Sequence, residues 1–213
     1  AVERFHRGEK YTVIGGYAGT GKSTLVNFIV KALNIAECDI VYTAFTGKAC
    51  QVLQKKGCRN VSTLHKLLYT SYPRPDGTFV RVPVEGIPYK IVIVDEVSMV
   101  RCDIIDGMDR ILRTVMKNTQ PFGGKQIIFS GDLYQLEPVF NKNDKGLVEF
   151  FYNEYNTDSP YFYHAHVFKR IKLPRIEFRK VYRQNDEHFL SILDNVRSGC
   201  YVSTDLMMLN NTA

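Results

Sequence analysis

The chain has 213 residues, 45% of them hydrophobic, and a formal net charge of +6. This length and apolar content suffice for one substantial domain with a buried core and part of a second. No apolar run approaches the roughly 18 residues that span a bilayer, and the opening residues AVERFHRGEK contain no apolar signal segment, so we expect a soluble, intracellular globular protein.

Strand and helix periodicities alternate along the chain, a pattern typical of a parallel sheet with helices on both faces. Residues 11–16, YTVIGG, predict a strand that ends in glycines, and apolar residues then recur at helical spacing from Leu25 to Leu33. A second strand is expected over residues 39–45 and a helix over 48–56, which Gly57 ends. The fold class predicted is therefore α/β.

Residues 69–90 interrupt this alternation. Their four prolines exclude a helix, and Asp76-Gly77 between two short alternating runs predicts a β-hairpin. Just before this segment, Ser62 is expected to be the N-cap of a short helix with the sequence TLHKLL. A small inserted hairpin is the simplest account of residues 69–90.

The second half returns to the alternating pattern. Residues 91–94, IVIV, are all β-branched, as expected for a central strand that is buried on both faces. The remaining predicted elements are a helix at 104–116, a strand at 125–130, a short helix at 147–155, a strand at 175–183 and a helix at 189–196 that Gly199 ends.

The cysteines indicate neither a metal site nor a disulfide framework. The five cysteines never form a CxxC pair, and we expect reduced, mostly buried thiols.

Between Val167 and Arg183, seven residues are basic and a single one, Glu177, is acidic. That segment is either a solvated edge strand and linker or a surface that follows nucleic-acid phosphates, and the residues alone favour neither.

The strongest motif is GYAGTGKS, Gly16 to Ser23, which matches G-x-x-x-x-G-K-[ST] between a predicted strand and a predicted helix. In such a loop the glycines let backbone N–H groups surround phosphate oxygens. Lys22 would reach the β- and γ-phosphates of ATP, and Ser23 would ligate Mg²⁺. The context of the motif argues against a glycine-rich turn that binds nothing.

Two further segments place polar side chains at the expected carboxyl edge of the sheet. IVIVDE delivers Asp95, suited to Mg²⁺, and Glu96, which could activate a water for attack on the γ-phosphate or could merely cap the following turn. FSGDLYQL places Gln135 near the same edge, either as a γ-phosphate sensor or as a surface residue of a loop. Spacing alone does not decide between these two interpretations of Gln135.

Five blocks resemble, in order, the helicase motifs of the RecD-like branch of superfamily 1, which includes the Pif-type helicases. The blocks are GYAGTGKST, TAFTGKACQVL with STLHKLL, IVIVDEVSMV, FSGDLYQLEPV, and KVYRQ with a following helix that ends in NVRSG. The resemblance extends over about residues 10 to 200 and implies a RecA-like P-loop NTPase domain. It also implies ATP-driven movement 5′ to 3′ along single-stranded DNA and unwinding at duplex junctions.

The resemblance assigns roles residue by residue. Lys22, Glu96, Gln135 and Arg183 take the catalytic positions, with Arg183 as an arginine finger that stabilises transition-state charge. A salt bridge at a domain junction is the alternative role for Arg183. The residues implied to bind ATP and Mg²⁺ are Gly16, Ala18, Gly19, Thr20, Gly21, Lys22, Ser23, Thr24 and Asp95, with Ser23 and Asp95 on the metal.

The DNA contacts implied by the resemblance are Thr46, Thr63 and His65, and the hairpin occupies the slot of the family's strand-separating pin. Phe79, near the hairpin tip, is a candidate for stacking on a base. Without the resemblance, the alternative for His65 is an ordinary, partly buried histidine. The alternative for Phe79 is a residue that only packs the hairpin.

The chain departs from the family pattern at both ends. No glutamine that could read adenine precedes residue 11, and the sequence stops thirty residues after Arg183, before the later motifs of a second motor domain. We therefore expect a fragment with three parts. These are a first motor domain at 1–68 and 91–178, the pin at 69–90, and a linker with the start of a second motor domain at 179–213.

Two other functions remain consistent with a P-loop. One is a phosphotransferase acting on a small molecule, against which Asp95, Glu96 and Gln135 argue because a kinase needs no residue that activates water. The other is a nucleic-acid-binding switch module that binds ATP without productive turnover.

Overall fold

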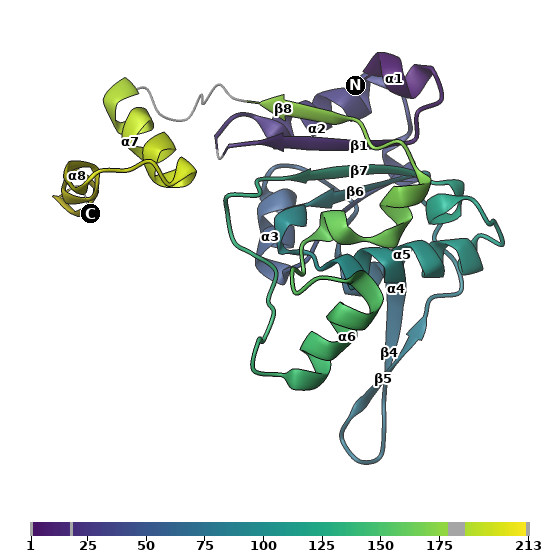
Figure 1. Ribbon diagram of the computed structural model, residues 1–213. Helices are drawn as coiled ribbons and strands as arrows, with labels where there is room; N and C mark the ends of the chain where they lie inside the picture. Colours follow the sequence, from purple (N-terminus) through teal and green to yellow (C-terminus); the bar gives the residue numbers. More distant parts are fainter. Residues whose placement is uncertain (1, 18, 179–185, 212–213) are drawn as a thin grey trace.

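The computed structural model describes residues 2–17, 19–178 and 186–211. Its centre is a six-stranded sheet in the order β3-β2-β6-β7-β1-β8, in which all neighbouring strands are parallel (Figure 1). The strands are β1 (Tyr11–Gly16), β2 (Ile40–Ala44), β3 (Val61–Thr63), β6 (Ile91–Asp95), β7 (Gln126–Gly131) and β8 (Arg175–Phe178). The predicted α/β class with a parallel sheet is confirmed.

Helices cover both faces of this sheet. One face carries α1 (Val2–His6), α2 (Lys22–Ala32) and α3 (Gly47–Lys55), and the other carries α4 (Leu64–Leu68), α5 (Cys102–Val115) and α6 (Lys145–Tyr155). Two helices, α7 (Glu187–Ser198) and α8 (Ser203–Asn211), follow the sheet in sequence. Among the described residues, 3₁₀ segments connect several of these elements: η1 (Glu37–Asp39), η2 (Val97–Met99), η3 (Pro121–Gly124), η4 (Phe162–His164) and η5 (His166–Arg170).

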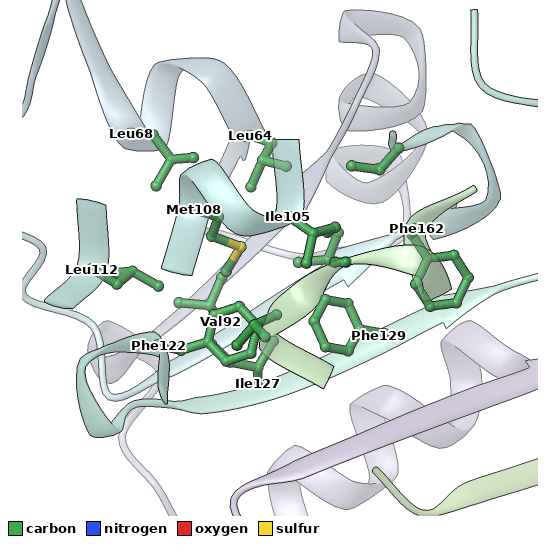
Figure 2. Close-up of a cluster of buried hydrophobic side chains, with 14 of the residues drawn as sticks. Leu64, Leu68, Val92, Ile105, Met108, Leu112, Phe122, Ile127, Phe129 and Phe162 are labelled. Carbon is green, nitrogen blue, oxygen red and sulfur yellow. The ribbon is translucent and has the colours of Figure 1, made fainter. Parts of the chain in front are cut away.

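Each buried strand feeds two cores because successive side chains point to opposite faces of a sheet. In β6, Val92 and Val94 pack toward α4 and α5, whereas Ile91 and Ile93 pack toward α2 and α3. The larger core gathers around Phe129, which is fully buried among Phe122, Phe162 and neighbouring aliphatic side chains (Figure 2). This double burial explains why residues 91–94 are uniformly apolar.

The predicted hairpin is present as β4 (Tyr69–Pro73) and β5 (Phe79–Pro83), an antiparallel pair that projects away from the sheet (Figure 1). At its tip, Asp76 accepts hydrogen bonds from the amide and the hydroxyl of Thr78 at 2.9 and 2.6 Å, and Gly77 adopts φ 79°. The chain after β5 is tied back to the domain by buried Lys125, whose Nζ donates to the carbonyls of Ile87 and Tyr89 at 2.8 and 2.5 Å.

Several local expectations can now be compared with the structure. The helix ends at Gly57 and Gly199 are confirmed, with φ of 88° and 73°. The choice of Ser62 as N-cap was wrong by one residue, because β3 extends through Thr63 and the Thr63 hydroxyl accepts from the Lys66 amide at 3.3 Å. Of the strand expected over residues 175–183, β8 covers Arg175–Phe178, and the rest lies outside the described residues.

Three of the five cysteines, Cys50, Cys58 and Cys102, are buried, and Cys38 and Cys200 are exposed; all five are free thiols. In the part of the chain that the structure describes, no helix combines the length and apolarity needed to cross a bilayer.

Candidate active site

The GYAGTGKS loop leaves β1 and enters α2 through three glycines with positive φ. Gly19 and Gly21 adopt φ of 77° and 86°, a conformation that glycine takes without steric cost. Gly16 has a second reason to be glycine, because a Cβ at this position would lie 2.5 Å from the carbonyl oxygen of Phe178 on β8. The loop backbone therefore approaches the neighbouring strand more closely than a side chain allows.

Lys22, the first residue of α2, folds its side chain back over this loop. Its Nζ donates to the carbonyls of Gly16 and Tyr17 at 2.6 and 2.9 Å. Burial lowers the pKa of Lys22, and the nearby carboxylates of Asp132, Glu96 and Asp95 oppose that shift. A partly desolvated ammonium at a helix N-terminus is suited to binding phosphate oxygens.

A cavity of about 620 Å³ opens in front of the loop. It is lined by Gly19, Gly21, Lys22, Ser23, Thr24, Asn27, Lys56, Asp95, Glu96 and Gln135. Three separate sequence motifs thus contribute side chains to one polar cavity, as expected for the carboxyl edge of a parallel sheet. Of the other residues expected to bind ATP, Gly16 and Thr20 do not line this cavity, and Ala18 lies outside the described residues.

Thr20 is 2% exposed and uses its side chain within the loop. Its Oγ1 donates to the carbonyl of Tyr17 at 2.7 Å, so the hydroxyl holds the turn closed. This bond fixes the same carbonyl that accepts from Lys22.

Asp95 and Glu96 occupy the end of β6 and the first residue after it. Glu96 has φ 51° and ψ 44°, a left-handed conformation that costs a non-glycine residue roughly 1–2 kcal/mol. Burial raises the pKa of Glu96, and the adjacent Asp95 raises it further, while Lys22 and Lys56 act in the opposite direction. A half-buried carboxylate with a raised pKa is suited to accept a proton from water.

Gln135 lines the cavity from the loop that follows β7, and Asp132 holds it there. The Gln135 Nε2 donates to Asp132 Oδ2 at 3.2 Å, and the Gln135 amide donates to the Asp132 carbonyl at 3.1 Å. The strand reaches this turn through Gly131, where a Cβ would meet the backbone nitrogen of Val97 at 3.0 Å. A side chain would be crowded where β7 passes the chain that follows Glu96, which favours glycine at this position.

Asp132 also binds a residue from α7. It is 2% exposed, and the Arg197 Nη2 donates to its Oδ2 at 3.0 Å. The same guanidinium lies over the ring of Tyr17 with its carbon 3.8 Å from the ring centroid. The residue named as an arginine finger, Arg183, lies outside the described residues.

The residues named as DNA contacts gather at the carboxyl ends of β2 and β3, which pair Ala44 with Thr63. Thr46 caps α3 by accepting from the Ala49 amide at 3.2 Å, and Thr63 caps α4. His65 packs its ring 5.6 Å from that of Phe45, and burial lowers its pKa, with Arg81 and Arg101 adding to the shift.

Phe79 stands apart from these residues, on β5 of the hairpin, where it is 67% exposed. Within the basic segment, Arg175 pairs with Glu177 at 2.9 Å, and Arg170 donates to the Thr119 carbonyl at 3.3 Å, so two of its arginines bind protein groups.

Three residues of the site, Asn27, Lys56 and Arg197, were missed from the sequence, and Asp132, expected at this edge of the sheet within FSGDLYQL, had been given no role. Asn27 lies one turn beyond Ser23 on α2, a spacing that could have indicated it. Lys56 donates its Nζ to Ser23 Oγ at 3.1 Å from 33 residues away, and Arg197 reaches Asp132 from 65 residues away. Contacts over such separations leave no local pattern in a single sequence.

The chain is similar in sequence and fold to known proteins. Residues 1–145 match the family described as AAA domain. The chain is 31% identical to the ATP-dependent DNA helicase RRM3 of Saccharomyces cerevisiae over 86% of its own length and 24% of the relative. It is 32% identical to the human ATP-dependent DNA helicase PIF1 over 86% of its length and 26% of the relative.

A solved structure gives the same picture. The Pif1 helicase of Bacteroides in complex with ADP-AlF3 and single-stranded DNA superposes with a TM-score of 0.76 at 30% identity, over 98% of this chain and 48% of that one. The chain thus spans about a quarter of the curated relatives and about half of the solved chain. These matches show that the chain belongs to this AAA-domain family and, within superfamily 1, to the Pif1-like helicases.

Proposed function

We propose that this chain is the first motor domain of an ATP-dependent DNA helicase that moves 5′ to 3′ along single-stranded DNA and unwinds duplex. The observation that carries the proposal is the single cavity that Lys22, Ser23, Asp95, Glu96 and Gln135 line together. The names of the relatives, ATP-dependent DNA helicases RRM3 and PIF1, support it.

In this proposal the loop and the N-terminus of α2 bind the phosphates of ATP. Lys22 exchanges its bonds to the loop carbonyls for bonds to the β- and γ-phosphate oxygens, where its charge offsets the negative charge of the nucleotide. Ser23 and Asp95 would hold Mg²⁺, since a hydroxyl and a carboxylate that line one cavity are oxygen ligands of the kind this ion takes together with phosphate and water.

Hydrolysis needs a water that attacks the γ-phosphorus in line with the bond to the β–γ bridging oxygen. Glu96 orients this water and takes its proton, as the bond from phosphorus to the bridging oxygen breaks and ADP leaves. Gln135, held by Asp132, contacts the γ-phosphate and reports its departure. Arg183 is proposed, from the family resemblance, to stabilise the charge of the transition state.

For DNA we propose a track over the carboxyl ends of β2 and β3. The first backbone N–H groups of α3, beside Thr46, and the segment from Thr63 to His65 face phosphates and bases without reading their sequence. The hairpin, with Phe79 exposed, is proposed to be the wedge at the junction of the two strands.

The test is ATP hydrolysis by the full-length protein with and without single-stranded DNA. We expect strong stimulation by DNA, its loss with Gln135→Ala at nearly unchanged ATP affinity, and loss of ATP binding with Lys22→Ala. Glu149→Ala, an exposed change on α6, is the matched control and should behave as the unaltered protein.

Three outcomes would contradict parts of the proposal. Equal hydrolysis with and without DNA would refute the motor and favour an ATP-binding switch. Transfer of phosphate to an added small molecule would favour a phosphotransferase. Unwinding of substrates that carry only a 3′ tail would refute the direction.

A further inference from the structure

Tyr17, the second residue of GYAGTGKS, is contacted from outside the loop by Arg197 of α7, whose guanidinium carbon lies 3.8 Å from the centroid of its ring. Burial raises the pKa of the Tyr17 hydroxyl, and the negative charge of Asp194, one turn before Arg197 on α7, raises it further. A cation stacked on an aromatic face favours one plane of the ring. A side chain from α7 thus contacts the phosphate loop at its beginning.

The carbonyl of Tyr17 belongs to the phosphate-binding machinery, because it accepts from both Lys22 Nζ and Thr20 Oγ1. A contact that restrains Tyr17 therefore restrains the residue whose carbonyl accepts from the lysine that would bind phosphate. The side chain of Arg197 is 19% exposed, and its second contact, to Asp132, ends on the carboxylate oxygen that also accepts from Gln135. The Arg197 guanidinium thus contacts Tyr17 of the phosphate loop and Asp132, the residue that binds Gln135.

We propose that Arg197 is a positioning residue of the nucleotide site: through its stack on Tyr17 it sets the phosphate loop, and through Asp132 it sets Gln135. The inference rests on the nucleotide site of the proposed function and adds to it a mechanical link between that site and α7. A nucleotide that draws Lys22 away from the Tyr17 carbonyl would alter the contact between Tyr17 and Arg197. Nucleotide binding at the loop and the position of α7 therefore depend on each other.

The test is a double-mutant cycle with a fluorescent ADP analogue and the 213-residue chain. Arg197→Ala should weaken binding about fivefold to tenfold, and Tyr17→Ala by a similar factor. If the two act together, Arg197→Ala should change affinity less than twofold when Tyr17 is already alanine. Arg197→Lys keeps the charge without the planar stack, so it should fall between alanine and the unaltered chain.

Two controls separate positioning from general damage. Arg59→Ala removes a 79% exposed arginine whose ion pair with Glu37 lies outside the cavity, and it should leave affinity unchanged. Hydrogen exchange of residues 188–198 should slow when the analogue binds the unaltered chain and should not respond in Arg197→Ala. Thermal melts of every variant identify any that do not fold, and Arg197→Lys then carries the comparison.

An equal loss from Arg197→Ala in both Tyr17 backgrounds would overturn the inference, since it would mean that the arginine does not act through Tyr17. Full affinity in Arg197→Ala would overturn it as well. Because the readout is binding without DNA, a lack of DNA-stimulated hydrolysis would refute the motor while leaving this link standing. Absence of any binding by the unaltered chain would refute both.

Discussion

At the scale of single residues, Glu96 has two features that lower the stability of the fold and bring no structural benefit. Its backbone is left-handed, and its carboxylate, half-buried beside Asp95, has a raised pKa. The folded state therefore binds the Glu96 proton more tightly than the unfolded chain does. The ionised side chain opposes folding at neutral pH, and this opposition fades as pH falls through the folded-state pKa toward 4.5.

Glu96→Gln tests this reading through both activity and stability. Turnover should fall by about a hundredfold or more because the proton acceptor is lost, while nucleotide binding persists. The melting temperature at neutral pH should rise, because a neutral amide replaces a half-buried charge. In the unaltered protein, the turnover number should decline on acidification at a higher pH than an ordinary glutamate, near 4.5, would produce.

Glu149→Gln, an exposed change on α6, is the matched control and should alter neither quantity. Retained turnover in Glu96→Gln would remove the assignment of Glu96 as the base. A lower melting temperature would show that the carboxylate stabilises the fold instead.

At the scale of elements, the hairpin shows the clearest separation between fold and function. Apart from Tyr69 and Val80, β4 and β5 are exposed, so they bury little apolar surface for the domain. Lys125 secures the chain just after the hairpin by donating to two carbonyls, which leaves the tip free to carry function without supporting the core.

Phe79→Ala should slow unwinding several-fold more than it slows ATP hydrolysis, because stacking on a base contributes about 1–3 kcal/mol in single-strand binders. Folding stability should change by no more than about 0.5 kcal/mol, since the ring is 67% exposed. Val82→Ala, on the same strand at 43% exposure, provides the comparison, with unwinding and hydrolysis both expected to persist. Parallel loss of both activities in Phe79→Ala would make it a packing residue.

At the scale of the whole molecule, the sheet is the support on which the site is assembled. Phe129 lies at its centre, fully buried on β7, with its ring 5.5–6.2 Å from those of Phe122, Phe162 and Phe168. Three residues after Phe129, directly past the end of β7, Asp132 accepts the hydrogen bond from Gln135, which lines the cavity. Core packing and site geometry are therefore coupled along a single strand.

Phe129→Ala should lower the free energy of unfolding by about 3–5 kcal/mol, measured by denaturant titration, because it leaves a cavity among rigid rings. Phe129→Leu should cost less, since it fills part of that volume. Phe150→Ala removes an aromatic ring that is 43% exposed on α6 and should cost much less than Phe129→Ala. Equal costs for the Phe129 and Phe150 changes would mean that the core around Phe129 relaxes freely.

The sequence by itself determined most of the elements and the chemistry of each motif. Periodicity, glycine positions and the GYAGTGKS and IVIVDE blocks are local signals, and local signals are written in contiguous residues. The error at Ser62 shows the limit even there, because the pairing of Ala44 with Thr63 decides where β3 ends and α4 begins.

Only the tertiary structure decided how the motifs meet. The strand order places β7 between β1 and β6, which brings Gln135 to the cavity that Lys22 and Glu96 line. The ion pair of Arg197 with the buried Asp132 and the bond from Lys56 to Ser23 join residues far apart in the chain. Such partners are chosen by the packing of strands and helices, and a single sequence records no trace of that choice.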